Sequence, residues 1–196
     1  FDSHLPSIMD FPLRDALCRA LCEDGKEWNG GMMRVYDCLS HDFVYHDLSK
    51  MMIFAGNHDT ERIGDILHGN AARMRLVMAM LATLRGIPQI FAGDEMMFRS
   101  ADLAQGHGGL RVDFPGGWRD DKVDLFDQAQ RTGVQKELFD YTAHLFSWRK
   151  GKEVIHSGRT MHFLSRDNTY AYFRYNATDA VFVYINNADE PRTVPW

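Results

Sequence analysis

Apolar and polar residues alternate along the first half of the chain in a pattern that predicts strands separated by helices. Between residues 71 and 85 the apolar positions recur at helical spacing, with Asn70 suited to cap the helix and Gly86 suited to end it. Short apolar runs that end abruptly in polar residues predict buried strands. In order, we expect an apolar run at 5–11, helices at 12–25 and 29–39, a buried strand at 50–56, the helix at 71–85 and a buried strand at 87–92. This alternation favours a parallel sheet with helices packed outside.

The second half of the chain predicts a long loop, one helix and then an antiparallel sheet. Residues 99–123 are irregular and rich in Gly, Asp and His, as a functional loop would be. A helical pattern follows at 134–150. Three strand patterns separated by turn residues come next, at 160–164, 170–175 and 180–185. We therefore expect two domains, 1–150 and 151–196, of which the second begins an antiparallel β domain.

Polar side chains follow the predicted strands of the first domain at the points where those strands end. Asp10 follows the first apolar run, Asn57-His58-Asp59 follows the second strand, and Gly93-Asp94-Glu95 follows the third. In parallel α/β folds this edge of the sheet holds the active site. The chain has no G-x-G-x-x-G and no P-loop Lys, which disfavours a nucleotide-binding doubly wound sheet. A piece of a (β/α)8 barrel fits better, although a whole barrel needs about 250 residues.

Composition and charge exclude several classes of protein. The 196 residues contain 22 Lys and Arg against 27 Asp and Glu, a net charge of −5, which argues against a nucleic-acid-binding protein. No apolar run approaches the roughly 18 residues of a membrane span. Three cysteines are too few for a disulfide framework, and their spacing indicates no metal site. Because the chain begins at Phe1 and stops within a strand-like pattern at 192–196, we expect a piece of a longer protein.

The segment Gly56-Asn57-His58-Asp59 is the strongest candidate for chemistry, and two enzyme classes compete for it. Metallophosphoesterases place G-N-H-D at a strand end, and this segment matches letter for letter. Their two-metal sites also need an upstream D-x-H and a G-D pair. The nearest candidates, His41-Asp42 and His46-Asp47, have the reverse order. The other class is the glycoside hydrolases, in which such side chains hold sugar hydroxyls as the ring flattens. In a third interpretation, Asn57 and Asp59 only cap the turn.

Segments at both strand ends carry a resemblance to one family. Residues 54–60, FAGNHDT, look like the F-x-x-N-H-D segment at the seventh barrel strand of the alpha-amylase superfamily. Residues 86–95, GIPQIFAGDE, resemble its eighth strand, G-x-P-x-x-Y-x-G-x-E, and residues 8–13, IMDFPL, are similar to its sixth. Residues 106–118, GHGGLRVDFPGGW, look like the loop after strand eight in the neopullulanase and cyclomaltodextrinase branch. The chain from residue 152 resembles the start of that branch's C-terminal sandwich, so the resemblance covers essentially the whole chain.

The resemblance implies a fold and a set of residue roles. The fold would be about strands six to eight of a (β/α)8 barrel followed by part of an antiparallel β-sandwich. Asp59 would stabilise the transition state by bonding the sugar at the cleavage point, His58 would bond the same sugar, and Asn57 would orient the loop. The long loop, with Asp102, His107, Arg111, Asp113 and Trp118, would line the sugar cleft; Arg111, Asp113 and Trp118 are our candidate substrate-binding residues there.

The implied parent protein is a retaining hydrolase of α-1,4 or α-1,6 glucosidic bonds in maltooligosaccharides, cyclodextrins or pullulan. The family's nucleophilic Asp and its general-acid Glu belong to strands four and five, and this chain contains no G-x-R-x-D segment. A pairing of Asp59 with Glu95 is disfavoured, because the Glu95 position indicates structural support. We therefore expect the chain alone to be inactive. A non-catalytic sugar-binding relative is a further alternative.

The remaining expectations concern cofactors and partners. We expect no cofactor and no metal ligand in this chain, although the resemblance allows calcium in the parent protein. The partner would be an α-glucan oligosaccharide, with neither nucleic acid nor membrane involved. The parent protein would form a homodimer through an N-terminal domain, as is usual in this branch. The sequence does not distinguish a cytoplasmic from a periplasmic or secreted location.

Overall fold

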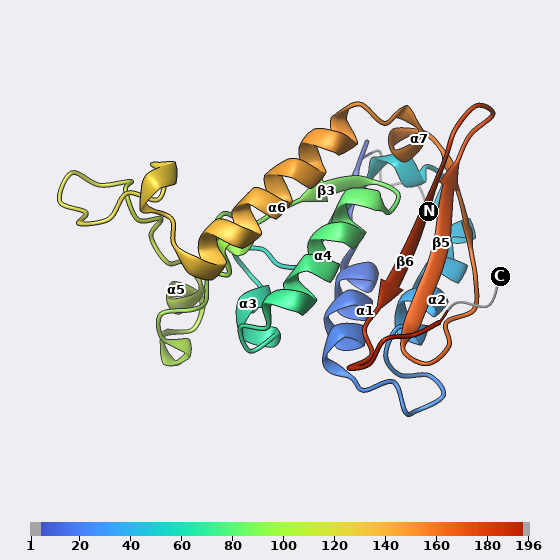
Figure 1. Ribbon diagram of the computed structural model, residues 1–196, viewed down its shortest axis with the longest axis horizontal. Helices are drawn as coiled ribbons and strands as arrows, with labels where there is room; N and C mark the ends of the chain where they lie inside the picture. The colour runs from blue at the N-terminus through green and yellow to red at the C-terminus, as the bar shows by residue number, and fades with distance from the viewer. Residues whose placement is uncertain (1–4, 194–196) are drawn as a thin grey trace.

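A computed structural model describes residues 5–193 and contains two three-stranded sheets (Figure 1). The first sheet is parallel, with strand order β1-β2-β3. The second is antiparallel, with order β4-β5-β6. The strands are β1 Ile8–Met9, β2 Met51–Phe54, β3 Ile87–Gln89, β4 Arg159–His162, β5 Thr169–Tyr175 and β6 Ala180–Asn186. The parallel pairing predicted for the first half and the antiparallel pairing predicted for the second are both confirmed. Residues 1–4 and 194–196, and with them the predictions made from Phe1 and from the end of the chain, lie outside the described part.

Helices connect the parallel strands and cover them, as the apolar spacing predicts. The α-helices are α1 Phe11–Cys22, α2 Met33–Ser40, α3 Ile63–Ile66, α4 Ala71–Thr83, α5 His107–Leu110, α6 Gly133–Lys150 and α7 Glu153–His156. Short 3-10 turns lie at Asp42–Val44, Leu48–Lys50, Asp94–Met96, Leu103–Gln105 and Gln128–Gln130. In the described part, no helix is both long and apolar enough to cross a membrane.

The ends of these helices follow from capping side chains and glycines. The Asn70 side chain accepts a hydrogen bond from the backbone N–H of Arg73, which caps α4 as predicted. Gly86 then turns the chain into β3 with a φ of +97°, and a Cβ there would lie 2.4 Å from the Met51 carbonyl oxygen. The helix predicted at 29–39 begins only at Met33, because Gly31 has a φ of +57°, which a right-handed helix does not allow.

The strand predicted at 87–92 is wrong in both length and burial. Only Ile87–Gln89 forms a strand, and Ile87 is 48% exposed. Within residues 5–193, β3 is an edge strand that pairs with β2 alone, so its apolar side chains are covered on fewer sides than those of a central strand. The chain then leaves the sheet and turns at Gly93, whose φ is +95°. The apolar run at 5–11 likewise contributes only Ile8–Met9 to the sheet.

One hydrophobic core spans both predicted domains. Leu17 and Val77 from α1 and α4 belong to the same buried cluster as Tyr170, Tyr172 and Ile185 of the antiparallel sheet. Figure 1 shows that sheet lying beside α1, α2 and α4. The hydroxyl groups of Tyr172 and Thr83, 89 residues apart, form a buried hydrogen bond of 2.5 Å. The two halves of the chain therefore pack as one body, and the domain boundary near residue 151 stays a prediction.

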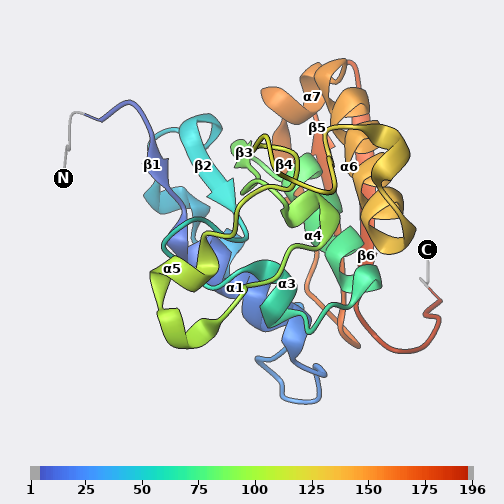
Figure 2. The same cartoon turned by 90° about the vertical axis from the view of Figure 1, so that its left-hand side faces the viewer.

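The long loop is the part of the molecule with the least regular structure, as predicted. Residues 99–132 contain only α5 and two 3-10 turns. Figure 1 shows part of this segment projecting from the side of the molecule away from the antiparallel sheet, and Figure 2 views the molecule from that side. A small number of side-chain contacts hold the loop near the carboxyl edge of the parallel sheet. These contacts define the candidate site.

Candidate functional site

The turn that follows β2 carries the three residues singled out by the sequence. Asn57 is buried, and its side-chain oxygen accepts a 2.9 Å hydrogen bond from the backbone N–H of Asp59. The backbone N–H of Asn57 donates to the Thr60 hydroxyl at 2.9 Å. These bonds hold the turn in place, as expected if Asn57 orients the loop, and contact between Asn57 and a substrate stays a prediction. His58 and Asp59 lie above it and are exposed.

The Asp59 carboxylate is surrounded by groups that can carry positive charge. One oxygen lies 2.8 Å from Nη2 of Arg111 and 3.8 Å from Nδ1 of His107, and the other lies 3.1 Å from Nε2 of His58. Nε of Arg111 also donates to the His58 carbonyl oxygen at 3.0 Å. The Asp59 side chain is nevertheless 57% exposed. Exposed pairs of this kind exchange readily with other partners because each contributes only about 0–1 kcal/mol.

A buried ion pair beneath this cluster joins three loops. Arg62 is 1% exposed, and its guanidinium lies 3.0 Å from the Asp94 carboxylate. It donates to the carbonyl oxygens of Ala92 at 3.1 Å and Leu110 at 2.9 Å, and it stacks 4.1 Å from the centre of the Phe91 ring. Leu110 directly precedes Arg111. The hydrogen bond from Arg62 to the Leu110 carbonyl oxygen therefore fixes the backbone from which the Arg111 side chain reaches Asp59.

Burial is the main influence on the Asp94 carboxyl group. It raises the pKa of Asp94 to about 7, although Arg62 beside it acts in the opposite direction. The neighbouring Glu95 turns its carboxylate back to accept the Gly93 backbone N–H at 2.9 Å. This bond agrees with the structural role expected for Glu95.

Asp94 is recognisable from the sequence as a strand-end residue, whereas Arg62 is not. Arg62 pairs with Asp94 across 32 residues and bonds Leu110 across 48 residues. No local pattern signals such contacts. The one sequence hint is a lone arginine immediately before the buried Ile63.

Two predicted substrate-binding residues lie apart from this cluster. Trp118 is 67% exposed, and its backbone N–H donates to the Asp121 carboxylate at 3.1 Å. Asp113 is exposed near a small surface hollow lined by Met97, among other residues. Within residues 5–193, no hydrogen bond or ion pair connects Asp113 or Trp118 to Asp59. The structure thus brings Asn57, His58, Asp59 and Arg111 together, and substrate contact by Asp113 and Trp118 stays a prediction.

The same geometry bears on the metallophosphoesterase alternative. In the described part of the chain, no group of three or more His, Cys, Asp or Glu side chains is arranged to hold a metal ion. The Asp59 carboxylate is instead paired with Arg111, a permanent cation. A two-metal phosphoesterase site therefore has no support from these residues.

Comparisons with known proteins identify one matching family model and several similar enzymes. The family model for the cyclo-malto-dextrinase C-terminal domain matches residues 160–196. A cyclomaltodextrinase of Geobacillus thermopakistaniensis is 23% identical over 192 residues, which are 96% of this chain and 29% of that protein. A cyclomaltodextrin glucanotransferase of Klebsiella oxytoca is 25% identical over 205 residues, covering 93% of this chain and 29% of that protein.

Solved structures agree at the level of the fold. The alpha-amylase of Geobacillus thermoleovorans, in its complex with acarbose, superposes with a TM-score of 0.72 at 21% identity. The superposition covers 95% of this chain and 38% of that one. The chain therefore spans well under half the length of the relatives it matches. By these matches, the chain is similar to cyclomaltodextrinases over most of its length, and its fold resembles the corresponding part of alpha-amylase structures.

Proposed function

We propose that this chain is the C-terminal part of a retaining α-glucan hydrolase. Residues 1–150 would supply about strands six to eight of a (β/α)8 barrel, and residues 151–196 would begin the β-sandwich. The parallel order β1-β2-β3 and the connecting helices support this assignment. The substrates of the whole protein would be maltooligosaccharides, cyclodextrins or pullulan, and the bonds cleaved would be α-1,4 or α-1,6 glucosidic bonds.

The observation that carries the proposal is the setting of Asp59. Its carboxylate lies at the carboxyl edge of the parallel sheet, is held by Arg111 and His58, and is open to solvent. A sugar whose hydroxyl groups approach this edge can donate hydrogen bonds to Asp59. Hydrogen bonds to charged groups contribute about 1.5–3 kcal/mol each. Bonds that strengthen as the ring flattens would lower the barrel enzyme's activation barrier by several kcal/mol, a common contribution in glycoside hydrolysis.

The remaining chemistry requires groups that this chain does not contain. Retaining hydrolysis uses a carboxylate nucleophile and a carboxylic acid that protonates the leaving oxygen. In the proposed assignment both belong to strands four and five of the parent protein. Asp59 by itself stabilises charge and neither attacks nor protonates. We therefore expect no turnover of cyclodextrin or pullulan by the chain alone, and measurable turnover would contradict the assignment.

Calorimetric titration with maltoheptaose tests the role of Asp59 directly. We expect weak binding by the chain and at least about tenfold weaker binding by Asp59→Asn, as the loss of one charge-assisted bond implies. Asp120→Asn is the matched control, because Asp120 is an exposed carboxylate on the same long loop. Equal binding by the wild type and Asp59→Asn would overturn the proposal.

A non-catalytic sugar-binding protein would pass the same titration, so a second experiment separates it. The coding DNA upstream of the codon for Phe1 can be sequenced. A G-x-R-x-D segment followed by a strand-end Glu supports the hydrolase. An upstream region that lacks both carboxylates supports the binding protein instead.

A further inference from the structure

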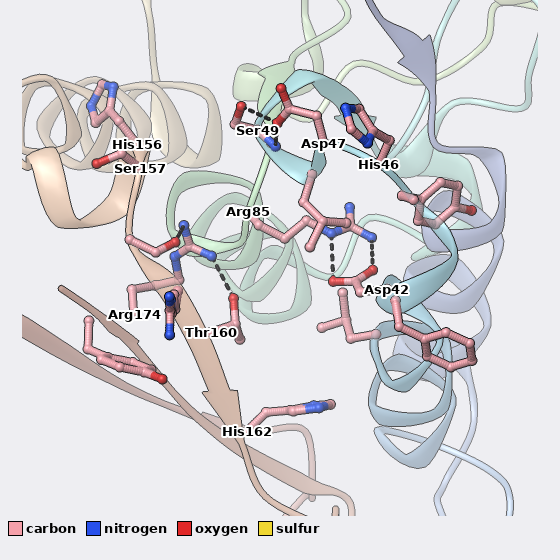
Figure 3. A pocket seen from close by; sticks show the side chains of 18 residues that line it. Asp42, His46, Asp47, Ser49, Arg85, His156, Ser157, Thr160, His162 and Arg174 are labelled. Carbon is pink, nitrogen blue, oxygen red and sulfur yellow. Dashed lines mark hydrogen bonds and ion pairs between the residues drawn. The ribbon is translucent and has the colours of Figure 1, made fainter. Parts of the chain in front are cut away.

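A polar cavity lies at the opposite edge of the parallel sheet from Asp59. Its volume is about 800 Å³, within the usual range for small-molecule sites. Ser49, just before β2, and Gly86, just before β3, line one side, and Thr160 and Arg174 of the antiparallel sheet line another (Figure 3). Asp59 follows β2 at its other end, so the cavity is separate from the candidate glucan site.

The acidic side chains of this cavity are already paired. Asp42 binds the guanidinium of Arg85 through both carboxylate oxygens, as Figure 3 shows, and Arg85 also binds Asp10. Asp47 lies 3.1 Å from Nζ of Lys50. Arg85 is thus shared by Asp10 and Asp42, and Lys50 pairs with Asp47. Among the described residues, none of these three carboxylates forms an ion pair with another basic group of the cavity.

Arg174, which lines the cavity, and Arg149, which bonds the carbonyl oxygen of the lining residue Gly86, are buried arginines without a carboxylate partner. Arg174 is 2% exposed and donates only to neutral acceptors: the Thr160 hydroxyl and the carbonyl oxygens of Ile155 and Gly158. Arg149, also buried, donates to the carbonyl oxygens of Ala82 and Gly86. Within residues 5–193, no carboxylate lies within ion-pair distance of either guanidinium. Buried charges are normally paired, so this arrangement is unusual.

Arg174 also retains an unused donor. Its Nε–H is buried and has no hydrogen-bond partner. Burial, together with the neighbouring cations Arg149 and Arg85, lowers the pKa of Arg174 to about 10, while Tyr172 and Asp42 act in the opposite direction. The side chain is therefore still charged at neutral pH. The excess of positive charge is local, because the chain as a whole carries a net charge of −5.

We propose that this cavity binds a phosphate group, free or carried by a small molecule, with Arg174 as its principal ligand. A phosphate in the cavity would lie beside the Arg174 guanidinium and would offset its unpaired positive charge. Planar guanidinium groups suit phosphate geometry. Arg159, which lines the cavity from an exposed position on β4, would add attraction at the rim. The alternative is that Arg174 only ties α7 and β4 to the sheet, in which case phosphate does not bind.

Calorimetric titration of the chain with sodium phosphate, against sodium chloride at equal ionic strength, tests the proposal. We expect one phosphate per chain with a dissociation constant of about 1 mM or tighter. Arg174→Gln should weaken it by about tenfold or more. Arg166→Gln, an exposed arginine on the other side of the antiparallel sheet, should leave it unchanged. An absence of phosphate binding, or equal binding by Arg174→Gln and the wild type, would overturn the proposal.

A second variant keeps the test valid if Arg174→Gln does not fold. Arg159→Gln removes an exposed charge at the rim, so its thermal unfolding temperature in chloride should match that of the wild type. Its phosphate affinity should fall by about threefold, as expected for a partly screened charge. Equal changes of phosphate affinity in Arg159→Gln and Arg166→Gln would show that surface charge in general, and not this cavity, attracts phosphate. That result would contradict the proposal.

Two further titrations distinguish the sources of the phosphate group. Glucose 6-phosphate that binds more tightly than inorganic phosphate indicates a phosphorylated small molecule, whereas equal affinity indicates that the phosphate group alone suffices. Both outcomes support the site when Arg174→Gln abolishes them. Binding of glucose as tight as that of glucose 6-phosphate would show that phosphate is not recognised, and it would contradict the proposal.

Discussion

The two edges of the parallel sheet differ in how their charged side chains are paired. At the carboxyl edge, Asp59 is exposed and paired with Arg111, while the buried Arg62 beneath it has its own carboxylate in Asp94. At the amino edge, Arg174 is buried without a carboxylate beside an open cavity. At the carboxyl edge, where the buried charges are paired, the exposed Asp59 carboxylate can bind a neutral sugar. At the amino edge, the positive charge of Arg174 has no carboxylate partner and attracts an anion. We therefore expect different ligands at the two edges.

Among the variants that test this comparison, we expect the largest loss of stability from removal of the buried Arg62–Asp94 pair. Arg62→Met would leave the Asp94 carboxyl group without a partner and would free the Leu110 carbonyl oxygen. Breaking a buried pair costs about 3–5 kcal/mol, which urea unfolding would measure. The matched control is Arg75→Met, because Arg75 pairs with Glu137 on the surface at 3.0 Å and its loss should cost below about 1 kcal/mol. Similar losses in both variants would contradict the assignment of Arg62 as the anchor.

At the amino edge, the close approach of Gly86 to β2 should be the next most sensitive feature. Gly86→Ala would place a Cβ against the Met51 carbonyl oxygen in a left-handed backbone conformation, and we expect a loss of more than about 2 kcal/mol. Gly69→Ala has the same backbone penalty without a contact within 4 Å, so its loss should be nearer to about 1 kcal/mol. Thermal unfolding of both variants measures the difference, and equal losses would argue against the close approach.

The buried carboxyl group of Asp94 predicts a pH dependence of stability. Because its folded-state pKa, about 7, lies above the ordinary value of 3.8, the folded protein holds this proton more tightly than the unfolded chain. The stabilisation is present below the ordinary value and is lost as the pH rises through about 7. Urea unfolding between pH 5 and pH 8 should therefore show a decline that is smaller in Asp94→Asn. The exposed Asp102→Asn should keep the wild-type slope, and an unchanged slope in Asp94→Asn would refute the prediction.

The smallest effect on stability is expected from the exposed pair at the carboxyl edge. Arg111→Gln should change the free energy of unfolding by less than about 1 kcal/mol. It should nevertheless weaken maltoheptaose binding severalfold, because Arg111 orients the Asp59 carboxylate. Arg119→Gln, an exposed arginine on the same loop, should change neither quantity. Maltoheptaose binding unaffected by Arg111→Gln would remove Arg111 from the proposed site.

The sequence predicts features that depend on neighbouring residues and misses those that depend on distant ones. α4 begins after Asn70 and the chain turns at Gly86, as the local signals indicate, and the parallel order of the strands follows from their alternation with helices. The short β3 was not predictable, because its exposure depends on which strands lie beside it. The bond between Thr83 and Tyr172, which joins the two halves, likewise has no local signal.

The candidate site shows the same division. Asn57, His58 and Asp59 were selected from one short segment, and Arg111 from a family resemblance in the long loop. Only the structure shows that Arg111 contacts Asp59. Arg62 was missed because its partners come from two other loops. Trp118 was selected from the same loop as Arg111, but its backbone bonds to Asp121 instead of to the Asp59 cluster.

The most direct test of the central claim is a nuclear magnetic resonance titration of the isotopically labelled chain with maltoheptaose. If the carboxyl edge holds the glucan, the backbone amide signals of His58 and Asp59 and the Nε signal of Arg111 should shift together and saturate at one affinity. The signals around Arg174, at the other edge, should not move. An absence of shifts at His58, Asp59 and Arg111, or shifts confined to the cavity at the amino edge, would contradict the claim that Asp59 belongs to a glucan site.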